Sequence, residues 1–284
     1  MAQNYATKYA SKVVERFKKE SITNRAAGND YSFAGAQTVV IGTVDTVALN
    51  DFNRTAASNR FGAVANLGNT KQELQMTQDK SFTFAIDAGD QSDTAIDMSA
   101  GKALRREIDE VVTPHIDKYR LGKWADGAGT VVYSGSSSAL TKATVLSAII
   151  DVGGELSNAL VPDASRTLYI PTRIYKLLVQ ADAVISLESL GTKAVGKGEV
   201  GEVDGNRIVK VPDSWFPTGV EFMIKYKNCT VDPIKFAHYR VLREAQGFDG
   251  PVVEGRLRFD SFVKEAVSAG IGVYKVGTKP ASGT

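Results

Sequence analysis

The pattern of hydrophobic and polar positions predicts two strands in the first third of the chain. Residues 37–49 are dense in β-branched side chains, and residues 80–87 alternate the apolar Phe82, Phe84 and Ile86 with smaller side chains. About thirty residues between these strands are mostly polar, which is long for a loop inside a compact domain. The two strands therefore predict a protruding hairpin with a polar tip, whose free edges a neighbouring chain would cover.

A helical repeat predicts one long helix over residues 92–126. Pro114 lies inside it and is expected to kink or break it near Glu110, because proline removes a helical hydrogen bond, and Gly127 and Gly129 are expected to end it. The opposite face alternates acidic and basic side chains, which is typical of a solvated or interfacial face. The apolar repeat consists of Ile96, Ala100, Leu104, Ile108, Val111, Val112, Ile116 and Tyr119.

The remaining segments mix short helices and strands. A second helix is expected from Thr141 to just before Pro162, and a third from Pro171 to about Ala181, whereas the glycine-rich residues 190–206 are expected to form a long loop. This order lacks the regular alternation of a doubly wound parallel sheet, so the sequence predicts an α+β fold. Further strands are predicted at 166–170, 207–212, 220–227, 251–263 and 270–276, and the apolar face of the second helix at Val145, Ile149, Val152, Leu156 and Leu160.

Residues 1–35 form a separate segment, which we call the arm. Apolar residues at helical spacing predict a short amphipathic helix near 8–20, and the rest reads as loop. The arm has too few apolar side chains to form a core of its own, so it must lie on another part of the protein or stay mobile.

Composition narrows the classes of function. The 284 residues carry 34 Lys and Arg against 32 Asp and Glu, a net charge of +2, without the basic excess typical of sequence-specific DNA-binding proteins. The single cysteine, Cys229, excludes an intramolecular disulfide and the zinc spacings of paired cysteines. No apolar run is long enough to span a membrane, so no membrane partner is expected.

Motifs for catalysis are weak. Residues 191–198 are one residue short of a phosphate-binding loop, and Gly198 stands where the magnesium-binding Ser or Thr would be. His115 and His238 show no metal-ligand spacing, and Cys229 is expected to be a buried, inert thiol. No catalytic residue, cofactor or metal is therefore predicted. Four carboxylates before the long helix complement a helix N-terminus and leave acid–base or metal chemistry as an alternative: Asp87, Asp90, Asp93 and Asp97.

The sequence resembles the major capsid proteins of tailed bacteriophages, which have the Hong Kong 97-type fold. The resemblance covers most of the chain in order, although no single run of residues is diagnostic. The runs that carry it are residues 9–17, 80–87, 98–112, 117–120, 250–256 and 260–263.

The resemblance implies a four-part organisation. It consists of the N-terminal arm (1–35), an extended E-loop hairpin (36–91), a peripheral P domain with a long spine helix (92–134) that the chain rejoins at 246–284, and an axial A domain (135–245). It implies a structural protein and not an enzyme, one that self-assembles into hexamers and pentamers and forms an icosahedral head shell around double-stranded DNA.

The resemblance also implies partners and a location. Besides other copies of the chain, these are a scaffolding protein, a portal, a decoration protein and the packaged DNA, contacted non-specifically. Because the arm starts at once, we expect either a separate scaffolding protein or a scaffolding segment already removed. The location implied is the virion capsid, assembled in the bacterial host cytoplasm. Some members cross-link a lysine to an asparagine; Lys71 and Lys80 lie in the hairpin, but no partner asparagine matches, so no cross-link is predicted.

Charged side chains are the candidate contacts between subunits. Arginine binds carboxylates with two parallel hydrogen bonds, so the hairpin arginines are expected to pair with a neighbour's carboxylates. The charged face of the long helix is the candidate acceptor. The candidates are Arg54, Arg60 and Lys71 on the hairpin, and Arg105, Arg106, Glu107 and Glu110 on the helix.

Three alternatives remain open. An encapsulin-like nanocompartment shell would share the fold but enclose protein cargo. An enzyme could use the carboxylates between Asp87 and Asp97, and would then need a defined pocket. A nucleic-acid-binding module could use the basic arm, and its binding would be tight and salt-dependent.

Overall fold

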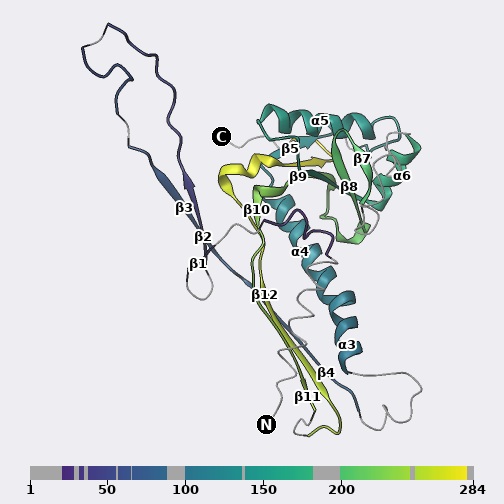
Figure 1. Ribbon diagram of the computed structural model, residues 1–284. Coiled ribbons are helices and arrows are strands. Elements are labelled where there is room, and N and C mark those ends of the chain that lie inside the picture. Colours follow the sequence, from purple (N-terminus) through teal and green to yellow (C-terminus); the bar gives the residue numbers. More distant parts are fainter. Residues whose placement is uncertain are drawn as a thin grey trace. The chain divides into compact units, whose positions relative to one another are not determined.

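The chain divides into two compact units in a computed structural model (Figure 1). The larger unit, which we call the body, comprises Met1–Asn29 and Thr77–Thr284, and the smaller, the hairpin unit, comprises Asp30–Met76. The structure describes residues 21–28, 32–34, 38–55, 57–64, 66–87, 100–135, 138–181, 199–243 and 247–279.

A six-stranded mixed sheet forms the centre of the body, in the order β5-β14-β9-β6-β8-β7. The pairs β5–β14 and β6–β8 are parallel, and the other three pairs are antiparallel. The fold is therefore mixed α and β, in agreement with the prediction. The strands are β5 (Thr130–Tyr133), β6 (Arg166–Pro171), β7 (Glu199–Val203), β8 (Asn206–Val211), β9 (Val220–Tyr226) and β14 (Ile271–Lys275).

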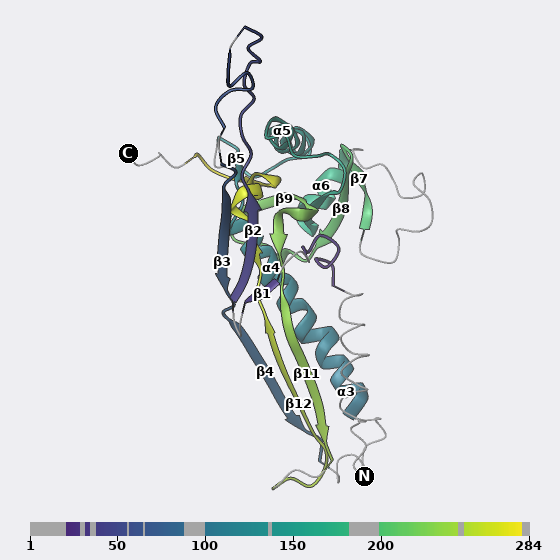
Figure 2. The same ribbon diagram turned by 60° about the vertical axis from the view of Figure 1, so that its left-hand side comes forward.

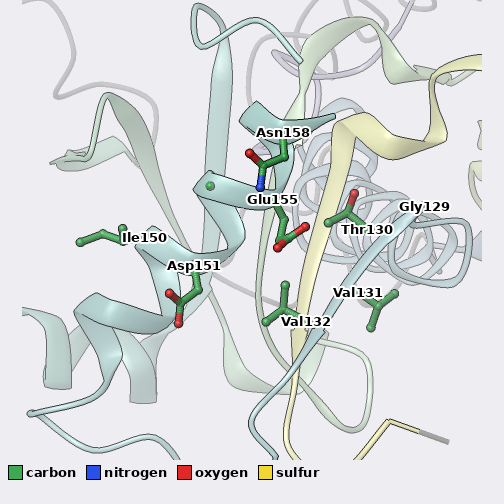
Figure 3. Close-up of a pocket in the computed structure, with 9 residues that line it drawn as sticks. Gly129, Thr130, Val131, Val132, Ile150, Asp151, Glu155 and Asn158 are labelled. Carbon is green, nitrogen blue, oxygen red and sulfur yellow. The ribbon is translucent and has the colours of Figure 1, made fainter. Parts of the chain in front are cut away.

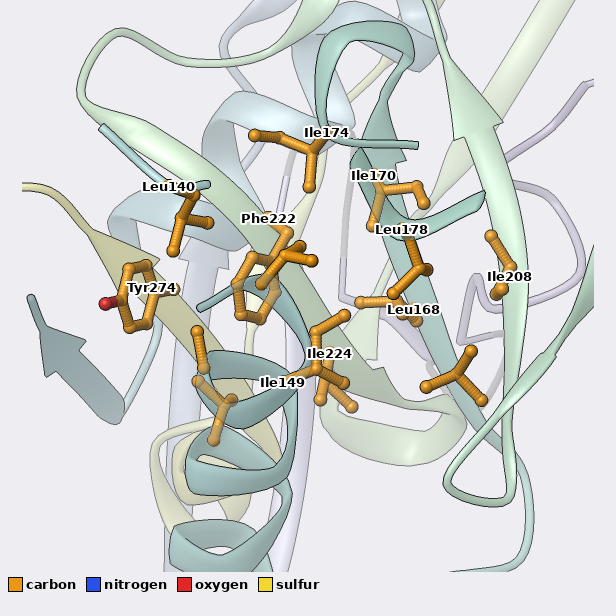
Figure 4. Close-up of a cluster of buried hydrophobic side chains, with 14 of the residues drawn as sticks. Leu140, Ile149, Leu168, Ile170, Ile174, Leu178, Ile208, Phe222, Ile224 and Tyr274 are labelled. Carbon is orange, nitrogen blue, oxygen red and sulfur yellow. The ribbon is translucent and has the colours of Figure 1, made fainter. Parts of the chain in front are cut away.

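Helices cover both faces of this sheet, because its central strands are apolar on both sides. Helices α5 (Val145–Asn158) and α6 (Thr172–Gln180) bury one cluster, which includes Leu168 and Phe222 (Figure 4). Helix α4 (Thr113–Asp126) buries a second cluster, in which Trp124 contacts Tyr169 edge to face. Leu168 and Tyr169 are neighbours in β6 and point to opposite faces, as alternation along a strand requires.

A second, antiparallel sheet has the order β11-β12-β4. Its strands β4 (Gln78–Ala85), β11 (Ile234–Leu242) and β12 (Val252–Phe259) lie beside helix α3 (Ala100–Glu107) in Figure 2. The inner side chains of these strands and those of the helix share a third hydrophobic cluster: Leu104, Ile108, Ile116, Tyr239, Val253, Leu257 and Phe259. The body is completed by the two-residue pair β10 (Thr230–Val231) and β13 (Phe262–Val263), and by the 3-10 turns Asp213–Trp215, Lys227–Cys229 and Glu265–Gly270.

The predicted long helix is present, and it is interrupted near Glu110. A π-helical segment, Ile108–Val112, joins α3 to α4, and the Thr113 N–H donates to the carbonyl of Ile108, five residues back. Pro114 explains this, because its ring nitrogen has no hydrogen for the carbonyl of Glu110. Gly127 caps the end of α4, also as predicted. The predicted first turns at 92–99 lie outside the described residues.

The hairpin unit corrects the predicted strand pairing. It contains β1 (Ser32–Ala34), β2 (Thr38–Val44) and β3 (Asn69–Gln75), and β2 pairs with β3. The predicted partner, the strand near 80–87, is β4 and pairs with β12 in the body. The sequence did not reveal β3 because six of its seven side chains are polar, so its backbone ladder and not an apolar face defines it.

Two other predictions were wrong. Residues 199–206, predicted as loop, form β7 and the start of β8, while 190–198 lie outside the described residues. Asp204 and Gly205 both have positive φ, 49° and 71°, which a two-residue hairpin turn requires. Leu160 was predicted on the buried face of α5, but the helix ends at Asn158 and Leu160 is 90% exposed. The strands β5 and β11 were not predicted.

Candidate assembly interface

The tip of the hairpin unit, which we define as residues 45–68, is held by backbone hydrogen bonds, and none of its described residues belongs to a hydrophobic cluster. The N–H of Asp45 donates to the carbonyl of Gly68 at 3.0 Å, and that of Asn53 donates to Arg60 at 3.0 Å. The rings of Phe52 and Phe61 in the tip meet edge to face, with centroids 5.0 Å apart. Loops of this kind keep their shape through few contacts, so the tip is suited to ordering against a partner.

The tip exposes large apolar side chains, which corrects the prediction of a polar tip. Leu49, Val64 and Phe61 are 101%, 95% and 83% exposed. Several large apolar side chains exposed in one short segment are typical of an interaction site. The residues were visible in the sequence, but the surrounding Asn, Gly and Arg residues masked them. The full set of exposed apolar residues at 44–67 is Val44, Val47, Leu49, Phe52, Phe61, Val64 and Leu67.

The charged candidates on the hairpin unit lie where the sequence suggested. Arg54 and Arg60 are exposed on the tip, and Lys71 is exposed on β3. The assignment of these three side chains to contacts between subunits stays a prediction.

The charged candidates on the helix lie in the body. Arg105 and Arg106 are exposed on α3, Glu107 is half-buried, and Glu110 is exposed on the π-helical segment. Arg106 Nε donates to Glu110 Oε1 at 2.8 Å, so two of the four already pair with each other along the helix. A neighbour that used this face would compete with that pair, which is worth about 0.3–0.5 kcal/mol in an exposed helix.

The outer face of the second sheet carries paired charges that the sequence did not reveal. Asp79 on β4 accepts hydrogen bonds from Arg256 at 2.6 and 2.9 Å and from Arg258 at 3.0 Å. These guanidinium groups hold the pKa of the Asp79 carboxyl below its ordinary value, and the hydrogen bond from Arg256 has the largest effect. Arg240 pairs with Glu254, directly opposite on β12. Cross-strand register brings these charges together, and register cannot be read from spacing along the chain.

Residues 21–28, which we call the strap, are anchored in the body by buried charges. The carboxylate of Asp117 on α4 accepts hydrogen bonds from the hydroxyls of Ser21 and Thr23 and, at 3.1 Å, from a backbone N–H of the strap. Arg120, three residues further along α4, donates to Thr23 Oγ1 at 3.1 Å. Burial raises the pKa of the Asp117 carboxyl, and the hydrogen bonds partly offset this effect. This part of the predicted arm therefore lies on the body.

The other end of the strap is held as firmly. The N–H of Gly28 donates to the Asp232 carboxylate at 3.1 Å, and the N–H of Asp232 donates to the carbonyl of Gly28, also at 3.1 Å. The fully buried ammonium group of Lys225 donates to the carbonyl of Ala26. A Cβ atom at Gly28 would overlap the carbonyl oxygen of Thr230, so only glycine fits this close approach.

The strap closes a buried network of polar groups. The Lys225 ammonium lies 4.4 Å from the Trp124 ring centroid, and Trp124 Nε1 donates to Asp232 Oδ1 at 3.1 Å. Burial lowers the pKa of Lys225 to about 8, against the opposing attraction of Asp232. Such a network is stable only while every member is paired, which couples the strap to the centre of the body.

The alternative chemical sites receive no support from geometry. Of the four carboxylates proposed, Asp87 is exposed and the other three lie outside the described residues, as does the segment 191–198. Within the described residues no cluster of His, Cys, Asp and Glu is suited to a metal ion, and no helix has the length and apolarity to cross a membrane. Cys229 is buried as predicted, and burial raises the pKa of its thiol.

Comparison of the fold with solved structures finds phage capsids. A chain from the capsid of cyanophage P-SCSP1u is 13% identical, with a TM-score of 0.72 over 92% of this chain and 89% of that one. A chain from Mycobacterium phage Che8 is 17% identical, with a TM-score of 0.68 over 90% and 91%. A chain from the capsid of Ralstonia phage GP4 is 10% identical, with a TM-score of 0.67 over 93% of both.

The chain therefore has the fold of phage capsid chains, over nearly its whole length and theirs. Comparison of the sequence itself finds no matching family model and no similar curated protein. The likeness thus lies in the arrangement of helices and strands, and it is the fold alone that these structures establish.

Proposed function

We propose that this chain is the major capsid protein of a tailed bacteriophage. It forms hexamers and pentamers that build an icosahedral head shell around double-stranded DNA, and its role is structural and not catalytic. The observation that carries the proposal is the agreement of fold over about nine-tenths of both chains with capsids of several different phages. An agreement of that extent takes in at least part of the hairpin unit as well as the body, and the hairpin unit has no evident use in a monomer.

The parts of the chain take the roles that the family resemblance implies. Residues 1–35 are the arm, 36–91 the E-loop region, 92–134 the P-domain segment with the spine helix, 135–245 the A domain and 246–284 the return to the P domain. The interrupted helix at 100–126 supports the P-domain assignment, and strands β6 to β9 with helices α5 and α6 support the A domain. Both sheets cross these bounds, because β5 and β14 belong to the P-domain segments, β4 to the E-loop region and β11 to the A-domain segment.

The hairpin tip then acts as an inter-subunit contact. Its exposed apolar side chains would be buried against the neighbouring subunit, at roughly 25 cal/mol for each Å² removed from water. Arg54 and Arg60 would add ion pairs to carboxylates of the neighbour, each worth about 0–1 kcal/mol on an exposed surface. Weak contacts repeated at every subunit give a stable shell, because each closed ring makes further contacts intramolecular.

The remaining partners follow from the same assignment. The shell would be built in the host cytoplasm with a scaffolding protein, would carry a portal and a decoration protein, and would become part of the virion. The net charge of +2 suits a shell that touches DNA without reading its sequence.

Electron microscopy of the purified chain, co-expressed with its neighbouring genes, tests the proposal. Closed shells or tubes of repeating capsomers are expected, and once packaging proteins are present the shells should contain DNA that is protected from added nuclease. Shells that enclose a second protein and no DNA would favour the nanocompartment alternative. A persistent compact monomer in all preparations would overturn the proposal.

A charge reversal at the tip tests the predicted ion pairs. Arg54→Glu with Arg60→Glu is expected to reduce the yield of shells, since two attractive contacts per subunit become repulsive. The matched control is Lys142→Glu with Lys176→Glu, which changes the net charge equally at two exposed positions of the body. Equal shell yields for both variants would show that the tip arginines form no such pairs.

A further inference from the structure

The two outer strands of the six-stranded sheet differ in how their edges are protected. Edge strands expose unpaired N–H and C=O groups, and proteins protect them with charges, prolines or bulges. At one end, β7 has both a register shift between Glu199 and Gly201 and acidic residues in its sequence. At the other end, β5 reads Thr-Val-Val-Tyr, with no charge, proline or glycine, and it pairs with β14 without a shift.

The outer edge of β5 is unpaired within the part of the chain that the structure describes. A strand with this composition and no protection is a template for pairing with another chain. Its backbone therefore offers hydrogen bonds to an extended segment, in the manner of strand addition.

A groove of about 790 Å³ lies between β5 and helix α5 (Figure 3). One wall is the β5 strand, where it passes through Thr130, Val131 and Val132. The other wall is formed by one side of α5, from which Asp151 and Glu155 extend. An added strand would thus have a sheet edge beside it and a helix next to it, as it would in a finished sheet.

The charge of the groove selects its occupant. Asp151 and Glu155 are both exposed, lie one helical turn apart, and are the charged residues among the nine that line it; none of the nine is basic. Pairing of β5 with β7 of another copy would bring acidic Glu202 toward these carboxylates, so charge opposes that arrangement. A segment with lysine side chains is complementary.

We propose that the free edge of β5 binds an extended, lysine-bearing segment of a second copy of this chain, which adds as a seventh strand. The lysines pair with Asp151 and Glu155, and the backbone completes the β5 edge. A second copy is the occupant because every subunit presents the same edge, and in a shell only a partner present once per subunit covers all of them. In this respect the proposal rests on the proposed shell function.

Zero-length cross-linking identifies the occupant. Particles are assembled from equal amounts of unlabelled and ¹⁵N-labelled full-length chain, treated with a carbodiimide that joins carboxylates to lysines, and mapped by mass spectrometry. The expected result is a link from Asp151 or Glu155 to a lysine, found with both isotopes in one cross-linked pair. Links within one copy, links to a different protein, or no links at these two carboxylates would each overturn the proposal.

The same preparation separates this proposal from the proposed function. Particles without the expected link contradict strand addition at β5 and leave the shell function intact. If no particles form, the shell function is contradicted, and no second subunit is then available to pair with β5.

Backbone hydrogen exchange tests the strand addition itself. The outward amides among residues 130–133 are expected to exchange at least about tenfold more slowly in particles than in the unassembled chain. Asp151→Lys with Glu155→Lys should lose most of this protection and lower particle yield, whereas the matched control Asp126→Lys with Asp249→Lys should keep both. Unchanged exchange at 130–133 on assembly, or equal behaviour of the two variants, would refute the proposal.

Discussion

The body buries charged side chains, whereas the hairpin unit exposes apolar ones. Lys225, Asp117 and Asp232 are at most 2% exposed in the body, yet each has hydrogen-bond partners of its own chain. In the hairpin unit, Leu49 and Val64 are almost fully exposed. These three buried charges are thus satisfied within the body, while the most hydrophobic side chains of the hairpin unit stay in water. If the proposed function is correct, this difference separates the part of the chain that provides stability from the part that is proposed to provide assembly.

The strongest test of this comparison removes a central member of the buried network. Asp232→Ala would leave Arg120 without its buried counter-charge and Trp124 and Ser261 without their acceptor. We expect the free energy of unfolding to fall by about 3–5 kcal/mol, because an unpaired buried charge remains. Urea unfolding of the unassembled chain measures it. The exposed Asp249→Ala should change stability by less than about 0.5 kcal/mol, and a similar small loss for Asp232→Ala would show that the network is not a source of stability.

A smaller effect is expected where the strap meets the body. Gly28→Ala places a methyl group against the carbonyl oxygen of Thr230, so the strap must shift. We expect a loss of about 1–3 kcal/mol, the usual effect of overpacking. The control is Gly122→Ala in α4, where a Cβ meets no atom within 4 Å and alanine should stabilise by about 0.5–1 kcal/mol. Two variants of equal stability would mean that the strap is not anchored at Gly28.

Buried Lys225 should make the free energy of unfolding of the body depend on pH. The pKa of Lys225 is about 8 in the fold and 10.5 ordinarily, so between these values the unfolded chain binds more protons at this position. Lys225 by itself should therefore make the free energy of unfolding rise with pH from about 8 upward, by at most about 1.4 kcal/mol per pH unit, and the raised pKa of the Cys229 thiol opposes this rise from about pH 9. Below pH 8 the lysine is charged in both states, and its buried charge lowers stability by a constant amount.

Urea titrations of wild type and Lys225→Met between pH 8 and pH 10 measure this slope. The upper limit matters because Tyr119 and Tyr239 have pKa values raised from 10 to about 12, and they lower stability as pH rises above 10. The variant should lose the rise. Parallel curves for the two proteins would contradict a charged, buried Lys225.

The smallest effect on folding is expected at the hairpin tip, where substitutions should leave stability unchanged but reduce assembly. Leu49→Gln with Val64→Gln should change the free energy of unfolding by less than about 0.5 kcal/mol, because both side chains are already in water. Shell yield in electron micrographs should nevertheless fall strongly. Leu160→Gln with Phe248→Gln, exposed apolar positions of the body, is the matched control and should still form shells. Normal shells from the tip variant would remove the tip from the assembly interface.

The hydrophobic pattern predicted the elements whose packing is local and regular. Strands β6, β8, β9 and β14, the apolar face of α5 and the interruption near Glu110 follow from residues close together in sequence. The hairpin strand β3 and its pairing did not, because a polar strand carries no periodic apolar signal and its partner is chosen by backbone register.

The candidate contacts were predicted only in part. The sequence placed Arg54, Arg60 and the charged helix face correctly on the surface, but it overlooked the exposed apolar residues of the tip. The strap network was also invisible, since the residues it joins, Asp117 and Thr23, are separated by 94 positions. Interactions between distant residues depend on tertiary arrangement, and a single sequence without such geometry does not reveal them.

The sequence by itself determined the class of fold, the long interrupted helix and the general expectation of a shell-forming protein. The fold class and the helix follow because helical and strand periodicities and the effect of proline act over a few residues, whereas the expectation of a shell came from the family resemblance. The tertiary structure alone decided which strands pair, which charges are buried together, which apolar side chains stay in water and which sheet edge is left open. These are properties of pairs of distant residues, and they are settled only when the chain has brought its buried groups into contact.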